Sequence, residues 1–219
     1  MYEREKEKSI FTFIIPIALV ILAIFLLYKS GRRNAIAGLD EPLQTPETGL
    51  IERTIGDWKL FFHYDYAYDI EALVIHTKNY SEKDIGGQLA PRDLALAWGS
   101  VAALNKAIDF HWSQSNRWYY WSTNSYSEIE PICLPGMDPA TSVSVQSANT
   151  HVIAADSSVK KVISKIRKGD HVHLKGYLVN ILGLSSDGNI FNWNSSTSRT
   201  DTGNGACEVF YVTEARILN

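Results

Sequence analysis

The sequence has few cysteines and little net charge, and it lacks the common catalytic and nucleotide-binding signatures. Its two cysteines, Cys133 and Cys207, permit one disulfide in an oxidising compartment, but two thiols are equally ordinary in a cytosolic protein. The net charge of -3 lacks the basic excess that is typical of nucleic-acid-binding domains. No G-x-S-x-G, Walker or dinucleotide-binding motif occurs. The composition therefore argues against a nucleic-acid partner and indicates no class of enzyme.

A long apolar run near the N-terminus, Ile10 to Tyr28, contains nineteen residues without a charge. As a helix it would rise roughly 28 Å, which matches the hydrocarbon core of a bilayer. A cleaved signal peptide is the alternative, because an A-x-A pattern occurs within 34–38. However, the run is longer than a usual signal-peptide core, and three basic residues separate it from that site. The pattern therefore predicts an uncleaved transmembrane helix.

The segment after the apolar run has two prolines, scattered charges and no sustained apolar period, which is typical of a tether. Basic residues on the two sides of the run balance, so the positive-inside rule gives no orientation. A short tail before one apolar segment and a folded domain favours a domain outside the cytoplasm. The predicted organisation is an N-terminal tail over 1–9, a transmembrane helix over 10–28, a tether over 29–56 and an extracytoplasmic globular domain over 57–219.

Strands are predicted from Trp58 onward. Between Phe62 and Val74, aromatic and aliphatic side chains share one parity and acidic residues take the other, which is typical of a strand with one buried face. The stretch SQSNRWYYW over 113–121 indicates a turn that enters a strand with aromatic residues on both faces. Because aromatic residues cluster between 58 and 121, we expect a β-rich core.

Two further segments have less regular patterns. One or two helical turns are predicted over 89–99, where Pro91 suits a first turn and Gly99 a helix end. The segment 122–149 contains three prolines and little periodicity. We therefore expect a long surface excursion there, which is a candidate binding loop.

The clearest amphipathic helix begins near Asp156, Ser157 and Ser158, any of which can cap it, and ends at Gly169. Beyond it the apolar parity slips near Gly176, as a β-bulge would cause. A bulged strand, a turn at 185–189 and two further strands are typical of a small coiled barrel. The predicted fold class is α+β: an N-terminal transmembrane helix, then a compact domain with an antiparallel, barrel-like sheet of the OB type and one amphipathic helix.

The segment SSTSRTDTGNGACE over 195–208 is the main candidate binding loop. Asp201 can close an Asx-type turn, and the glycines around it tolerate positive φ. Arg199 could pair with Asp201 and tie the loop to itself. Alternatively, a glycine-rich loop that carries arginine could present backbone N–H groups to an anion. The candidate binding residues are Arg117, Arg199, Asp201, Gly203, Asn204 and Gly205.

No catalytic residue, metal site or cofactor is predicted. His171 and His173 are two apart on an expected strand, a spacing that lets two imidazoles share a metal. No nearby residue makes an obvious third ligand, and Lys175 on the same parity favours a polar outer face. For Cys133 and Cys207, a disulfide, a metal pair and two buried thiols remain open.

Four stretches, in order after one apolar segment, resemble a family of uncharacterised bacterial proteins with a single membrane anchor: LAPRDLALAWG, SQSNRWYYW, SANTHVIAADSSVKKVISKIRKGDHVHLKGYLV and SSTSRTDTGNGACEVFYV. The resemblance covers about Trp58 to Val212. It implies a single-pass protein of the bacterial inner membrane with a periplasmic C-terminal domain, and it brings no established activity. The run 125–146 departs from the family's usual length, which argues against a shared disulfide at Cys133 and leaves Cys207 as a buried thiol.

Two functional hypotheses follow. The first is a non-enzymatic, membrane-tethered binding or assembly module of the bacterial cell envelope. It would contact the membrane through Ile10 to Tyr28 and bind another envelope protein, not nucleic acid. The second is an envelope hydrolase or transferase that uses Arg199, Asp201 and Glu208, with His151 or His173 brought near by folding. It requires a pocket where these groups converge within hydrogen-bond reach.

Overall fold

The computed structural model describes residues 14–24, 35–124, 126–201 and 205–218, which belong to two units, 1–34 and 35–219. The described part of the first unit is a helix over 14–24. Across the described residues, no helix has both the length and the apolar character needed to cross a membrane. The predicted transmembrane helix over 10–28 and the single-pass inner-membrane location are therefore wrong; 10–13 and 25–28 lie outside the described ranges.

β1 (Leu43–Ile55) and β2 (Trp58–Asn79) form an antiparallel hairpin that turns at Gly56, where φ is 58°. β1 is an outer strand of the sheet, and over its second half the side chains alternate between half-buried and exposed. Such partial cover leaves only a weak apolar period, which is why the sequence predicted a tether over 29–56. Nearly half of that segment is instead the first strand.

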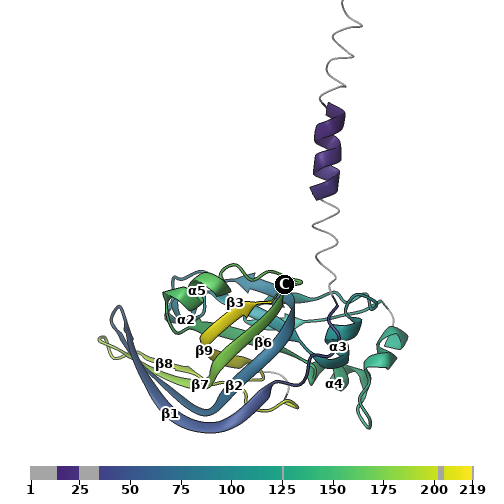
Figure 1. Ribbon diagram of the computed structural model, residues 1–219. Helices are drawn as coiled ribbons and strands as arrows, with labels where there is room; N and C mark the ends of the chain where they lie inside the picture. The colour runs from purple at the N-terminus through teal and green to yellow at the C-terminus, as the bar shows by residue number, and fades with distance from the viewer. Residues whose placement is uncertain (1–13, 25–34, 125, 202–204, 219) are drawn as a thin grey trace, which may run out of the picture. The chain divides into compact units, whose positions relative to one another are not determined.

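β2 is the strand on which the sheet is built, and its alternation between Phe62 and Val74 was predicted correctly. It pairs antiparallel with β1 along its first part, with β7 (His171–Ser185) over most of its length, and with β3 (Arg92–Ala97) at its end. Each of these three pairings contains a register shift. Because such shifts bend a strand locally, so long a strand curves strongly, as Figure 1 shows.

The strands form one seven-stranded sheet in the order β1-β2-β3-β6-β9-β7-β8, with a further pairing between β2 and β7. β6 (Ser147–Ala154) and β9 (Glu208–Ile217) run parallel, whereas the other pairings of this sheet are antiparallel. β8 (Ile190–Trp193) is the second outer strand. The bulge predicted near Gly176 is confirmed, because the β7–β9 register shifts between Lys175 and Gly176.

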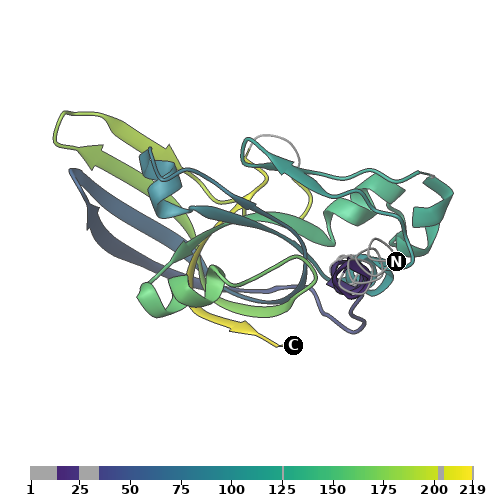
Figure 2. The same ribbon diagram turned by 90° about the horizontal axis from the view of Figure 1, so that it is seen from above.

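The predicted α+β fold class is wrong. The described chain is mostly sheet, and within the second unit its helices span only five to seven residues. Such short helices cap the ends of the sheet and do not form a layer over it. β1 and β8 extend the sheet beyond the strands that an OB-type barrel would use. α2 (Ile85–Leu89) and α5 (Ser157–Ile163) lie toward one end, α3 (Gly99–Leu104) and α4 (Pro139–Ser144) toward the other (Figures 1 and 2).

The helical turns predicted over 89–99 are replaced by strand β3. Every residue from Asp93 to Ala97 is buried, because β3 lies between β2 and β6 with both faces covered. A strand that is buried on both faces shows no alternation, so its periodicity does not distinguish it from a buried helix. Gly99, predicted to end a helix, begins α3.

The segment 122–149, predicted to be a surface excursion, contributes to the core. It contains the 3-10 helix η1 (Tyr126–Ile132), α4 and the first residues of β6. Ile129, Ile132 and Val143 are almost completely buried in the larger hydrophobic cluster of the domain. The apolar period is missing because the elements are short, not because the segment is exposed.

α5 is the predicted amphipathic helix, but it is shorter than expected. The Asp156 carboxylate caps it as predicted, since it accepts hydrogen bonds from the backbone N–H groups of Ser158 and Val159. The helix ends at Ile163 and not at Gly169. Arg92 from β3 donates to the carbonyl oxygens of Ser164 and Ile166, and these contacts replace the helical bonding of the next turn.

Candidate functional site

A hairpin of β4 (Ser113–Ser115) and β5 (Trp118–Tyr120) forms one side of the candidate site. It confirms the turn predicted in SQSNRWYYW, and its two turn residues, Asn116 and Arg117, have φ values of 51° and 68°. Two consecutive positive φ values are typical of the type I′ turn, although arginine rarely adopts that conformation. This tight turn sets the direction of Arg117 and of the three aromatic residues that follow it.

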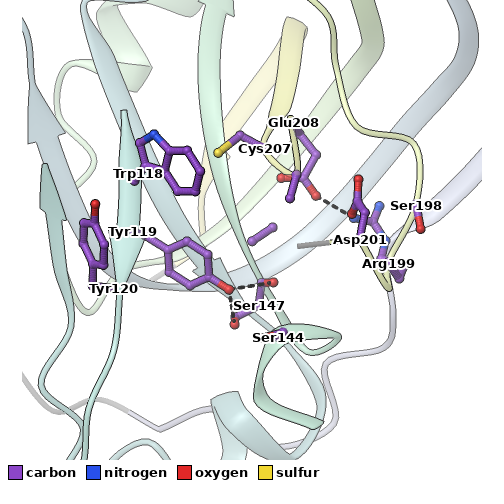
Figure 3. A pocket seen from close by; sticks show the side chains of 12 residues that line it. Trp118, Tyr119, Tyr120, Ser144, Ser147, Ser198, Arg199, Asp201, Cys207 and Glu208 are labelled. Carbon is purple, nitrogen blue, oxygen red and sulfur yellow. Dashed lines mark hydrogen bonds and ion pairs between the residues drawn. The ribbon is translucent and has the colours of Figure 1, made fainter. Parts of the chain in front are cut away.

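A pocket of about 250 Å³ lies between this hairpin and the segment 198–208. Figure 3 shows the rings of β5 on one side and Arg199, Asp201 and Glu208 on the other. Ser144 of α4 and Ser147 of β6 also border it. The lining residues are Trp118, Tyr119, Tyr120, Ser144, Ser147, Ala148, Ser198, Arg199, Asp201, Ala206, Cys207 and Glu208.

Only some of the candidate binding residues lie together in this pocket. Arg199 and Asp201 line the pocket, together with Glu208 from the hydrolase hypothesis. Arg117 does not line it; it borders a separate, more open hollow with Tyr80 and Trp193. Gly205 precedes the lining residue Ala206, while Gly203 and Asn204 lie outside the described residues.

A buried ion pair closes the base of the pocket. Arg199 Nη1 donates to Glu208 Oε1 at 2.5 Å, and Nη2 donates to the Tyr68 hydroxyl at 2.9 Å. The expected ion pair between Arg199 and Asp201 is therefore wrong, because folding brings a buried carboxylate from β9 closer. Thr150 donates to the other oxygen of Glu208 at 3.3 Å. The pair thus joins the loop to β2, β6 and β9.

Burial dominates the electrostatics of this ion pair. It raises the pKa of the Glu208 carboxyl, although the Arg199 guanidinium opposes that rise. Burial lowers the pKa of Arg199, but Tyr68 and Glu208 raise it above the ordinary value for arginine. Burial, reinforced by the Glu208 charge, holds the pKa of Tyr68 well above its usual range. Arg199 and Glu208 each offset the cost of burying the other's charge.

Hydroxyl groups organise the loop around Asp201. Ser196 Oγ donates to Asp201 Oδ2 at 2.7 Å, and Ser198 N donates to Ser196 Oγ at 3.1 Å. Ser195 Oγ accepts a hydrogen bond from Val209 N at 3.0 Å, which fastens the start of the loop to β9. Gly205 has a φ of 97°, in the left-handed region.

We expect the loop to act as a clasp between β8 and β9. Asp201→Ala removes the hydrogen bond from Ser196 and should lower the free energy of unfolding by about 1 kcal/mol. Gly205→Val should cost more, because a β-branched residue fits positive φ poorly. Thermal unfolding of the full chain measures both variants. Unchanged melting temperatures in both would show that the loop does not stabilise the fold.

Cys207 is a half-buried thiol next to Glu208 in the chain, and both cysteines are free in the structure. Asn149 Nδ2 donates to Cys207 Sγ at 3.4 Å and to the Arg117 carbonyl oxygen at 2.7 Å. Burial, with added repulsion from Glu208 and other carboxylates, raises the pKa of the Cys207 thiol to about 11. Cys207 therefore carries a proton near neutral pH and is a poor nucleophile.

Alkylation tests this protonation state. At pH 8 a thiol with a pKa of about 11 is a thiolate in only about one molecule in a thousand. In Cys133→Ser, iodoacetamide should therefore modify Cys207 at least about 100-fold more slowly than free cysteine at pH 8. Its rate should still rise about tenfold per pH unit above pH 9. A plateau already at pH 9 would contradict the raised pKa.

A second buried ion pair, missed by sequence reasoning, lies beyond Asn149. Arg117 Nη1 donates to Asp93 Oδ1 at 2.8 Å, and the Asp93 side chain is fully buried. The same oxygen is 3.0 Å from His151 Nδ1, but without the alignment of a hydrogen bond. The guanidinium also stacks 3.9 Å from the Tyr80 ring centroid. The only sign of this cluster in the sequence is a carboxylate inside the apolar stretch RDLALA.

The other histidines take structural roles. His171 Nε2 lies 2.7 Å from Glu71 Oε1, and His173 Nε2 lies 2.6 Å from Asp69 Oδ1. The two imidazoles thus bind carboxylates across the β2–β7 pairing and not each other. In the part of the chain that the structure describes, no three His, Cys, Asp or Glu side chains are grouped as they would be around a metal ion.

Comparison with known proteins identifies no relative of the chain. The chain matches no protein-family model, no curated protein and no solved structure. The family resemblance carried by the four sequence stretches therefore stays a prediction, and function has to be argued from the pocket.

Proposed function

We propose that residues 35–219 form a non-catalytic binding module whose ligand occupies the pocket between β5 and the segment 198–208. The observation that carries this proposal is an aromatic wall beside a preformed hollow. Trp118, Tyr119 and Tyr120 all border the pocket, and Tyr120 is 50% exposed. Aromatic side chains give large contact areas at low entropic cost, and a concave surface with a few polar groups is the usual form of a ligand site.

One ring of the aromatic wall, that of Tyr119, is held in place by the fold. The Tyr119 ring stacks on Trp112 with the planes 13° apart, and its hydroxyl lies 3.2 Å from Ser147 Oγ. Burial raises the pKa of Tyr119 to about 12, so its hydroxyl keeps its proton at neutral pH. A wall that is already fixed loses little conformational entropy when a ligand binds, which favours affinity.

The polar groups of the pocket support binding better than group transfer. Arg199 and Glu208 bind each other, and Cys207 is protonated near neutral pH. None of the described lining residues is a histidine. The general base that a hydrolase or transferase would need is therefore not supplied by His151 or His173, which lie in the clusters of Asp93 and Asp69.

A ligand-observed NMR screen of small fragments against the full chain tests this proposal. Ala206→Phe, which adds a ring at a lining position, should abolish binding of the hits. Ala37→Phe adds the same ring at an exposed residue outside the lining and should leave binding unchanged. Hits that bind equally well to Ala206→Phe would contradict the proposed site. Turnover of a fragment by the chain, lost in Glu208→Gln, would contradict the non-catalytic role.

A further inference from the structure

The balance of charge in the pocket indicates which ligands it accepts. Three lining side chains are acidic or basic: Arg199, Asp201 and Glu208. The first and last neutralise each other through their contact at 2.5 Å, and both are largely buried. Asp201 is exposed, and among the described residues no cationic side chain forms an ion pair with it. The pocket therefore has an excess negative charge near its opening.

The wall opposite Asp201 also favours a cation. Figure 3 shows Trp118, Tyr119 and Tyr120 across the pocket from the carboxylates. The face of an aromatic ring carries negative potential, and it attracts ammonium groups most strongly where water is excluded. The fold already uses this interaction on the other side of the pocket base, where the Arg199 guanidinium lies 5.2 Å from the Tyr68 ring centroid and 5.6 Å from that of Trp98.

An anionic ligand would meet unfavourable conditions. It would approach Asp201, and its natural partner, the Arg199 guanidinium, already donates to Glu208 and Tyr68. Displacing Glu208 would leave a buried carboxylate without its cation, which is strongly unfavourable. A neutral ligand could donate a hydrogen bond to Asp201 but would gain no attraction between opposite charges. Charge and geometry therefore both select a positive group.

The size of the pocket limits that group. A volume of about 250 Å³ is below the roughly 300–1,000 Å³ that is typical of sites for whole drug-sized ligands. It suits one side chain or head group. We propose that the pocket binds an alkylammonium group, placed between the Asp201 carboxylate and the rings of Trp118 and Tyr120. This inference rests on the proposed binding function, and a lysine side chain or a free small amine could supply the group.

Calorimetric titration of the full chain at low ionic strength tests the inference with three matched probes. These are the Nα-acetyl amides of lysine, norleucine and glutamate, which are cationic, neutral and anionic. The lysine amide should bind about tenfold more tightly than the norleucine amide, from one partly exposed ion pair plus a cation–π contact. n-Butylammonium tests the free amine: equal affinity identifies the ammonium as sufficient, and weaker binding indicates a peptide source. Both results support an alkylammonium site.

Substitutions inside and outside the pocket test where the lysine amide binds. Asp201→Asn and Trp118→Leu should each weaken the lysine amide several-fold and weaken the norleucine amide less. Asp187→Asn makes the same charge change at an exposed turn residue outside the pocket and should have no effect. Equal binding of the lysine and norleucine amides, or tighter binding of the glutamate amide, would overturn the alkylammonium site. If fragments bind in the pocket but no cationic probe does, this inference fails alone; if nothing binds there, the proposed function fails as well.

Discussion

Gly176→Ala is expected to prevent the domain from folding, or to lower its free energy of unfolding by more than about 4 kcal/mol. A Cβ at Gly176 would lie 1.9 Å from the Tyr211 carbonyl oxygen, which is backbone and has no flexible end to move. The residue sits at the β7–β9 bulge and pairs with Tyr68 on one side and Val212 on the other. Neither neighbour can move away without breaking its own pairing. Urea unfolding of the full chain, followed by circular dichroism, measures the effect.

Gly188→Ala is the matched control for this prediction. Gly188 also has a positive φ, 81°, but a Cβ there would meet no atom within 4 Å. Its substitution should therefore cost only about 1–2 kcal/mol, the penalty for an L-residue in the left-handed region. Equal urea midpoints for the two variants would show that the close approach at the bulge does not determine the fold.

Arg117→Met should lower the free energy of unfolding by about 3–5 kcal/mol, the usual cost of removing one partner from a buried ion pair. Without the guanidinium, the fully buried Asp93 carboxylate would lose its arginine partner and keep His151 and Tyr80 as polar neighbours. The guanidinium also donates to the Ala90 carbonyl oxygen at 2.7 Å, and that acceptor would lose its partner. Methionine keeps most of the apolar stem, so the loss measures charge and hydrogen bonding more than packing.

Two further variants separate the ion pair from other effects. Adding Asp93→Leu to Arg117→Met removes both charges and should recover a large part of the loss, because apolar pairs replace buried ion pairs well. Arg53→Met provides the matched control: Arg53 donates to the Ala154 carbonyl oxygen at 2.9 Å, and its loss should cost only about 1 kcal/mol. A double variant less stable than Arg117→Met would contradict this account of the cluster.

Local patterns predicted the features that depend on neighbours in sequence. The alternation after Trp58, the cap at Asp156, the turn in SQSNRWYYW and the parity slip at Gly176 are each set by residues within a few positions of one another. All four agree with the structure. Such features follow from backbone geometry and hydrogen bonding over one or two turns.

Features that depend on distant partners were predicted poorly. β3 was predicted to be helical because it lies between β2 and β6 and is buried, so its sequence lacks the alternation of a half-exposed strand. β1 was predicted to be unstructured because it is an outer strand and only partly buried. Spacing suggested that Arg199 pairs with Asp201, whereas folding supplies Glu208, whose position relative to the loop depends on β9. The sequence singled out the loop as a candidate site and the loop lines the pocket, but the aromatic wall of that pocket comes from a hairpin about 80 residues earlier. Only the fold brings these two segments together.

The most direct test of the account is to locate a bound ligand on the folded chain. Titration of the ¹⁵N-labelled full chain with the tightest fragment from the screen should move the amide signals of Tyr119, Ala148, Ala206 and Cys207, which surround the pocket. The backbone amide signals of Leu182 on β7 and Ile190 on β8, two exposed residues that do not line the pocket, should stay in place. Shifts confined to that outer surface, with the pocket signals unchanged, would contradict the claim that this pocket is the binding site.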